Sequence, residues 1–264
     1  MTKVPEEKDK KKAKTPYTAP ALEKGLDIIE LLSGEESGLT LSEIATKLSR
    51  STSEIFRMLA VLDRRGYLST ESGRDTYVLT MKLFELSHQH SLVKRLTGAS
   101  LPIMQKLAPA IEQSCHLSVY HRGKVLVIGQ RDSQMDLGFR VKLGSEIDLV
   151  DTCSGHVLMA FAEDDMLKQM LQERAGDSFK KSALMARLKK VREQGYESKQ
   201  SQQVSGVRDI SYPVFGYTSE VLAAITVPYL ERLDNAPHPT FDQVKEMLSA
   251  AAHSISLQLG YKPE

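Results

Sequence analysis

Apolar residues near the N-terminus recur at the spacing of amphipathic helices. From Leu22 to Leu32 the pattern predicts one helix, which ends at Ser33 and Gly34. The segment 39–49, LTLSEIATKLS, predicts a second and shorter helix, with Thr40 or Ser42 as its N-terminal cap. Two short helices in close succession must cover each other's apolar faces.

A third helix is predicted over 51–66, STSEIFRMLAVLDRRG. Four apolar side chains occupy positions i, i+3, i+4 and i+7 and must face inward: Ile55, Met58, Leu59 and Leu62. The outer face of the N-terminal half is polar and consists of Ser51, Thr52, Ser53, Glu54 and Arg57. A helix-turn-helix protein carries its base- and phosphate-reading side chains in this place. Glu54 can accept from cytosine but repels phosphate.

Two short alternating segments follow and predict strands at Tyr67–Thr70 and Thr76–Thr80 around a Ser-Gly turn. A hairpin directly after a recognition helix is a wing. Arg74 at its tip suits a phosphate or minor-groove contact. The alternative is a three-helix domain with a hairpin and no nucleic-acid partner.

From Met81 to Thr97 the sequence predicts a helix that joins two halves of the chain. Its apolar stripe is wider than a solvated linker requires, so we expect it to pack against a second subunit. After Pro102 the pattern changes to a mixture of strands and helices.

The second half predicts hairpins with helices between them, which is typical of an α+β domain with an antiparallel sheet. The expected strands are 115–121, 124–130, 137–145, 206–215 and 220–230. The expected helices are 103–114, one that begins near Thr152, Asp164–Arg174, Lys181–Gln194 and Phe241–Leu259.

Composition adds little that is specific. The 264 residues suffice for two domains, and 41% hydrophobic with 26% charged residues is typical of globular proteins. The net charge of +1 does not by itself indicate nucleic acid. Cys115 and Cys153 suggest no disulfide framework, and no apolar run reaches the length of a membrane span. These features predict a cytoplasmic protein with no membrane partner and imply no cofactor.

The first 20 residues contain six lysines and three acidic residues and have almost no large apolar side chains. This composition predicts a disordered basic tail. The tail either meets phosphates as a basic arm or is solvated without a partner.

The segment 150–161, VDTCSGHVLMAF, carries the candidate chemistry of the second half. Thr152 or Ser154 can cap the helix that follows, and Gly155 allows another segment to approach its first turn. Unpaired N–H groups and the helix dipole would bind a carboxylate there, beside Cys153 and Ser154. The alternative is an ordinary helix start packed on the sheet.

Other chemistries remain as alternatives. Cys153 and His156 lie three positions apart, so a cysteine nucleophile with Asp209 as the orienting residue is conceivable. The protein would then be an enzyme acting on a small acid, with the winged helix as a docking module. A metal site could draw on Cys153, His156, His121 or His116, but CxxC spacing is missing. The sequence has no Gly-rich phosphate loop, HExxH or GxSxG motif. A protein-interaction scaffold without DNA is a further alternative.

From about Ala21 to Gly260 the chain resembles the IclR family of bacterial transcription regulators. The motifs that carry the resemblance are ALEKGLDIIELL, the spacing from STSEIFRMLAVLDRRGYL to YVLT, TCSGHVLMAF, GYESKQSQQVSGVRDISYPVF and VLAAITV. The resemblance implies an N-terminal winged helix-turn-helix, a linker helix and a C-terminal GAF-like α+β effector-binding domain. It also implies dimers or dimers of dimers on palindromic double-stranded operator DNA, with small organic or aromatic acids as effectors.

Carried over position by position, the resemblance implies an effector site formed by Cys153, Ser154, Gly155, Asp209, Ser211, Thr226 and Pro228. Three features depart from the family pattern. The family often has an acidic pair where this chain reads 199–202, KQSQ; His156 replaces a common lysine; and Asp209 replaces a neutral residue. Lys199 could instead supply a positive partner for the ligand.

The sequence as a whole therefore predicts a ligand-responsive, DNA-binding transcription regulator that is not an enzyme. The expected parts are a basic tail (1–20), a winged helix-turn-helix domain (21–80), a linker helix (81–99) and an effector-binding domain (100–264). The expected partners are operator DNA, a small-molecule effector and further copies of the same chain.

Overall fold

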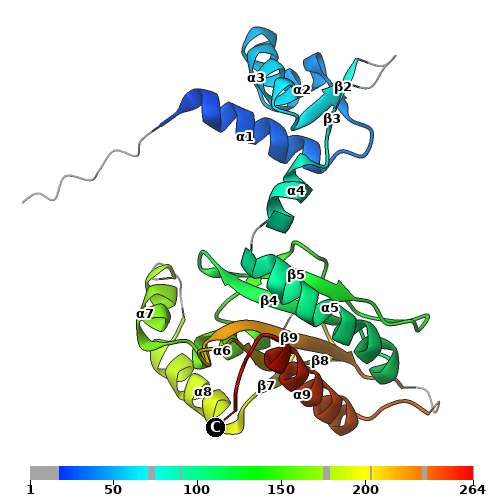
Figure 1. Cartoon of the computed structure of the whole chain (residues 1–264), viewed down its shortest axis with the longest axis vertical. Coiled ribbons are helices and arrows are strands. Elements are labelled where there is room, and N and C mark those ends of the chain that lie inside the picture. The colour runs from blue at the N-terminus through cyan, green and yellow to red at the C-terminus, as the bar shows by residue number, and fades with distance from the viewer. Residues whose placement is uncertain are drawn as a thin grey trace, which may run out of the picture. The chain divides into compact units, whose positions relative to one another are not determined.

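The structure is a computed structural model that describes residues 18–70, 75–89, 91–174, 179–202, 204–233 and 237–263. The chain divides into two compact units, Met1–Gln89 and His90–Glu264 (Figure 1). Within the described residues, no helix is long and apolar enough to cross a membrane.

The first unit combines a helix-turn-helix with a small antiparallel sheet in the order β1-β3-β2. Its core consists of apolar residues from all three leading helices and from the sheet, including Ile28, Ile44, Ile55, Leu59 and Leu68. The elements are α1 (Pro20–Ser33), β1 (Leu39–Thr40), α2 (Leu41–Lys47), α3 (Thr52–Arg64), β2 (Leu68–Thr70), β3 (Thr76–Leu79) and α4 (Lys82–Gln89). The three helices predicted over 22–32, 39–49 and 51–66 and both wing strands are confirmed, and Thr40 is the cap of α2. The linker helix predicted over 81–97 falls on two helices, α4 and the helix Ser91–Ile111.

The second unit is an α+β domain built on a six-stranded sheet in the order β6-β5-β4-β9-β8-β7, with antiparallel pairing throughout. Its strands are β4 (Cys115–His121), β5 (Lys124–Arg131), β6 (Glu146–Asp148), β7 (Glu197–Gln200), β8 (Val207–Phe215) and β9 (Val221–Leu230). Its helices are α5 (Ser91–Ile111), α6 (Cys153–Ala160), α7 (Asp164–Gln172), α8 (Lys181–Gln194) and α9 (Phe241–Gln258). The predicted fold class is confirmed.

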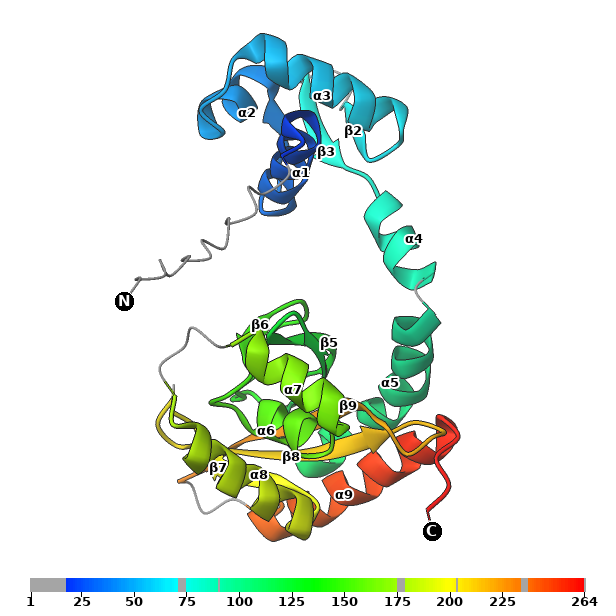
Figure 2. The ribbon, with the colours of Figure 1, turned by 90° about the vertical axis from the view of Figure 1, so that its left-hand side faces the viewer.

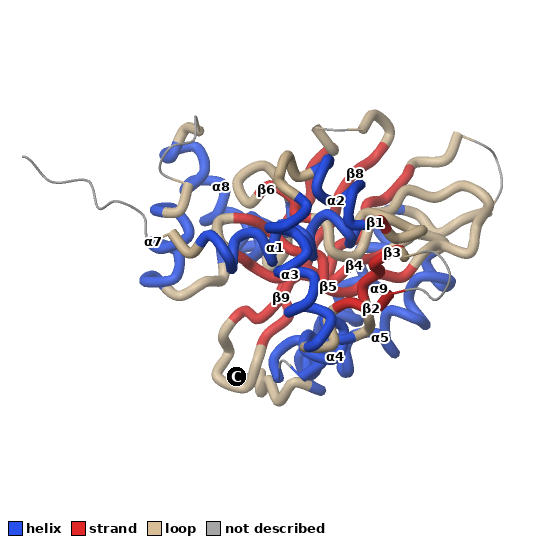
Figure 3. Tube along the Cα trace, turned by 90° about the horizontal axis from the view of Figure 1, so that it is seen from above, coloured by secondary structure: helices blue, strands red, loops and turns tan. Residues whose placement is uncertain are grey.

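Helices cover both faces of this sheet. α5 and α9 pack on one face, and α6 packs on the other with α7 and α8 against it (Figure 2). Seen along another direction, the strands run between these two groups of helices (Figure 3). Each face has its own hydrophobic core. The polar residues of the candidate effector site lie on the α6 face.

Two predicted elements were wrong. Residues 137–145 form no strand. Of the four apolar side chains that suggested one, Leu137 and Leu143 are exposed by 82% and 63%, whereas Phe139 and Val141 are half-buried. The pattern change at Pro102 does not begin a new helix, because α5 continues through Pro102 and Pro109. Each proline removes one helical hydrogen bond. The buried face of α5, which includes Leu96, offsets that cost. The short strands β1, β6 and β7 were not predicted.

Candidate DNA-binding and effector sites

The N-terminus of α3 is held by a reciprocal capping box between Ser51 and Glu54. Ser51 Oγ accepts from the Glu54 amide at 3.4 Å, and Glu54 Oε2 accepts from the Ser51 hydroxyl at 2.9 Å. Lys24 of α1 donates to Glu54 Oε1 at 2.6 Å. Hydrogen bonds from Lys24 and Ser51 lower the pKa of Glu54 to about 2. Glu54 therefore fixes the start of α3 against α1, and its oxygens are already engaged.

The outward face of α3 exposes the side chains of Thr52, Ser53 and Arg57. Sequence reasoning missed Phe56, which lies beside them and is 55% exposed. The sequence feature that could have identified Phe56 is its position on the outer face of a helix whose other residues on that face are polar. Arg74, predicted at the wing tip, lies outside the described residues.

The start of α6 opens onto a cavity of about 380 Å³ in the second unit. Of the predicted effector residues, Cys153, Ser154, Asp209 and Thr226 line it. Further lining comes from the apolar side chains of Phe139, Val141 and Ile147 and from the polar residues His116, Asp148, Asp151, Thr152, Lys199, Gln200, Ser201 and Gln202. The cavity thus joins five strands, β4, β6, β7, β8 and β9, with the start of α6 and the loops beside them.

The other three predicted residues support this cavity and do not line it. Gly155 allows the Leu149 carbonyl to approach, since a Cβ built on Gly155 would lie 1.9 Å from that oxygen. Ser211 Oγ and Thr226 Oγ1 are hydrogen-bonded at 2.8 Å. Pro228 lies opposite Asp209 in the register of β8 and β9.

Thr152 caps α6, and its hydroxyl oxygen accepts from the Gly155 amide at 3.2 Å. Cys153 and Ser154 lie in the first turn of α6. Their backbone N–H groups therefore have no carbonyl of the helix to donate to. Every residue of α6 is buried. The result is a rigid, positively polarised end of a helix in the cavity wall.

Two titratable side chains in the cavity are affected by burial. Burial raises the pKa of Asp209 to about 6, although the charge of Lys199 acts in the opposite direction. Burial lowers the pKa of His116 to about 4, so its ring is neutral at pH 7. Lys199 Nζ donates to the carbonyl oxygen of Asp151 at 2.9 Å. Sequence reasoning had named His116 only as a conceivable metal ligand.

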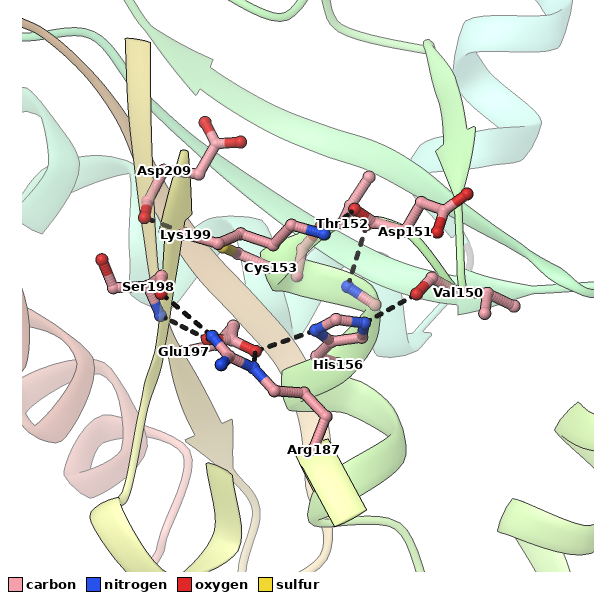
Figure 4. A network of polar contacts seen from close by, with 12 residues as sticks. Val150, Asp151, Thr152, Cys153, His156, Arg187, Glu197, Ser198, Lys199 and Asp209 are labelled. Atoms are coloured by element: carbon pink, nitrogen blue, oxygen red, sulfur yellow. Dashed lines mark hydrogen bonds and ion pairs between the residues drawn. The ribbon is translucent and has the colours of Figure 1, made fainter. Parts of the chain in front are cut away.

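Behind the cavity a buried carboxylate joins β7, α6 and α8 (Figure 4). Glu197 Oε2 lies 2.8 Å from His156 Nδ1 and accepts from Arg187 Nε at 2.7 Å. The other His156 nitrogen lies 2.6 Å from the Val150 carbonyl oxygen. Burial alone would raise the pKa of Glu197, but hydrogen bonds from His156 and Arg187 outweigh it and lower the pKa to about 2.

This network argues against a nucleophilic Cys153. Both ring nitrogens of His156 face Glu197 or Val150, so neither is directed at the thiol. Burial and the charge of Asp209 raise the pKa of Cys153, which keeps its sulfur protonated. The described residues also contain no group of three His, Cys, Asp or Glu side chains that could hold a metal ion.

Comparison with known proteins gives matches in both units. Residues 21–72 match the IclR helix-turn-helix domain, and residues 90–257 match the C-terminal domain of bacterial IclR transcriptional regulators. The chain is 29% identical over 262 residues to the HTH-type transcriptional regulator KdgR of Escherichia coli, covering 94% of this chain and 95% of that one. It is 26% identical to the regulator XynR of the same organism, covering 91% and 97% of the two chains.

Solved structures share the fold. An IclR homolog from Microbacterium hydrocarbonoxydans, complexed with 4-hydroxybenzoate, aligns with a TM-score of 0.73 at 21% identity over 90% of this chain and 98% of that chain. The Thermotoga maritima IclR structure aligns with a TM-score of 0.68 at 22% identity over 91% and 98% of the two chains.

Proposed function

The chain belongs to the IclR family of bacterial transcriptional regulators, and from that premise we propose that it binds a palindromic operator as a dimer or dimer of dimers and releases or reshapes it when a small organic or aromatic acid binds. Its DNA-binding, ligand-responsive regulatory role follows from the family, and its named homologues are regulators. The enzyme alternative is therefore set aside. The domain boundaries and site residues given above are part of the proposal.

The feature that carries the effector half of the proposal is the cavity at the start of α6. Polarised amides at Cys153 and Ser154 suit a carboxylate, and the three apolar side chains suit the rest of a small acid. The IclR homolog solved in complex with 4-hydroxybenzoate is consistent with an acid ligand.

The acid must bind one arrangement of the oligomer better than another to change DNA binding. In our proposal, closure of the cavity changes the distance between the recognition helices of two subunits. Half-sites lie about one helical turn of DNA apart or a multiple of it, so a small change in this distance weakens binding. An acid that alters neither oligomer geometry nor operator affinity would contradict the mechanism.

We expect Arg57→Ala to weaken operator binding by ~10- to 100-fold, because an exposed arginine on α3 would contact a base or phosphate. Fluorescence anisotropy with DNA from upstream of the protein's own gene measures this change at several salt concentrations. Wild-type affinity should fall steeply with salt. As a control, Lys190→Ala, at an exposed position of α8, should bind like wild type. Equal affinity of the Arg57 variant and wild type would remove Arg57 from the interface.

We expect at least one small acid to raise the melting temperature, since a ligand that binds only the folded state stabilises it. At a concentration ~100 times Kd the gain in free energy of unfolding is about 2.7 kcal/mol. A thermal-shift screen of carboxylic, hydroxy and aromatic acids measures it, and Asp209→Ala should lose the shift. Gln243→Ala, on α9 away from the cavity wall, serves as the control. A shift retained in the Asp209 variant would place the ligand elsewhere.

A further inference from the structure

His116 is a buried side chain of the cavity wall without a hydrogen-bond partner. It is 3% exposed and lines the cavity, and both Nδ1 and Nε2 lack a partner among the described residues. Across the sheet it lies opposite Thr226, which lies opposite Ser211. The hydroxyls of Thr226 and Ser211 already bond to each other.

An unpaired buried imidazole is costly. Leaving a buried polar group without a partner typically costs ~1–3 kcal/mol. Because the ring is neutral, one nitrogen donates and the other accepts. A ligand group that meets His116 must therefore be polar, and a hydroxyl can accept from the N–H.

Asp209 offers the complementary acceptor. The described residues supply no hydrogen bond to its carboxylate oxygens, and Lys199 donates to the Asp151 carbonyl instead. In Figure 4 the Asp209 carboxylate points away from the network of Glu197 and Arg187. Its oxygens are available to accept from a ligand.

Among the described residues, three carboxylates and one lysine line the cavity, and Asp148 is already paired with Arg174, so Lys199 is the cation that acts on Asp209. Lys199 already acts on Asp209 electrostatically and lines the same cavity. A ligand ammonium at Asp209 would add a second cation beside Lys199. A hydroxyl donates to Asp209 and accepts from His116 without adding charge.

We propose that the cavity selects a hydroxy acid, whose carboxylate meets the amides of Cys153 and Ser154 and whose hydroxyl is held between His116 and Asp209. This inference rests on the proposed function, since it names the ligand class of the same site. His116 is then a residue that determines specificity and not only a wall of the pocket.

Isothermal titration calorimetry with matched acids tests the inference. The probes are lactate against propionate, 4-hydroxybutyrate against butyrate, 6-hydroxyhexanoate against hexanoate, and 4-hydroxybenzoate against benzoate. In at least one pair the hydroxylated acid should bind ~10-fold tighter or more, because a hydrogen bond to a charged group contributes that much. Equal affinities within every pair, or no binding by any probe, would overturn the inference.

His116→Phe keeps an aromatic ring and removes both nitrogens, and Asp209→Asn keeps the side-chain size and removes the charge. His116→Phe should abolish the preference for the hydroxylated acid and leave the unsubstituted acid within about twofold of its wild-type affinity. Asp209→Asn should reduce the preference. A purely structural role would instead weaken both acids of a pair equally, and a preference that survives both variants overturns the assignment.

Operator binding by the same ligand-free protein separates this inference from the proposed function. DNA binding with no preference for hydroxy acids would overturn only the ligand class. If the wild-type protein bound no operator DNA, the proposed function itself would be contradicted. Thermal melting of each variant shows whether it is folded before its titration is interpreted.

Discussion

Replacing Glu197 with alanine is expected to lower the free energy of unfolding of the second unit by about 3 kcal/mol, because its removal leaves the charge of Arg187 uncompensated and takes away the partner of His156 Nδ1. Glu197 is 0% exposed and bonds to both His156 and Arg187. These contacts tie β7 to α6 and α8. Arg187 is 34% exposed, and its access to solvent keeps the expected loss near the lower end of the range for buried pairs.

The same network predicts a pH dependence. The pKa of Glu197 is lowered from 4.5 to about 2, so its ionised form stabilises the fold. That contribution is fully present above pH 4.5 and is lost as the pH falls toward 2. The Glu197→Ala variant should therefore lose less stability than wild type over that range.

Urea denaturation at one fixed protein concentration, followed by circular dichroism, measures both effects, because oligomer stability depends on concentration. Glu246→Ala, an exposed glutamate on α9, is the matched control and should change stability by less than ~0.5 kcal/mol. If Glu197→Ala were as stable as Glu246→Ala, the buried network would not contribute to folding.

Elements whose apolar pattern reflects real burial could be predicted from the sequence. β4 lies exactly where alternation placed it, at Cys115–His121, and α8 has both of its predicted ends. The strand predicted at 137–145 was wrong: Leu137 and Leu143 are exposed, and Phe139 and Val141 line the cavity from a segment that is not a strand. β7 was missed because its four residues include a buried glutamate, whose burial depends on partners from two other elements.

The same distinction applies to the candidate sites: features set by residues close in sequence could be predicted, and features set by distant residues could not. Local signals identified the capped starts of α2 and α6, since a cap and its partner are three residues apart. Position-by-position resemblance brought in Asp209 and Thr226, and both line the cavity. His116 could not be singled out from the sequence, because its lack of a hydrogen-bond partner among the described residues depends on how β4 and β9 pair. The hydrogen bond from Lys24 of α1 to Glu54 could not be predicted, because the two residues are 30 positions apart in sequence.

Gly155→Ala is expected to destabilise the second unit by about 3 kcal/mol and to abolish acid binding, because the new Cβ would collide with the backbone of Leu149. The Cβ would lie 1.9 Å from the carbonyl oxygen and 2.6 Å from the carbonyl carbon. Backbone atoms cannot rotate away as a flexible side chain can. Either α6 or the segment before it must shift.

A shift of α6 has few directions open to it, since all eight of its residues are buried and it packs on β8, β9 and α8. Any movement also displaces the Cys153 and Ser154 amides that we propose bind the carboxylate. Loss of stability and loss of acid binding should therefore occur together in this variant, whereas His116→Phe should change only the preference among acids.

Gly98→Ala is the matched control, because Gly98 is an exposed helical glycine of α5 with nothing within 4 Å of its added Cβ. That change should leave stability unaltered or raise it by up to about 1 kcal/mol, through the higher helix propensity of alanine. Urea denaturation and calorimetry on both variants measure the contrast. If Gly155→Ala matched Gly98→Ala in stability and still bound the acid, the close approach of Leu149 to α6 would not exist, and with it the rigid helix start on which the effector site depends.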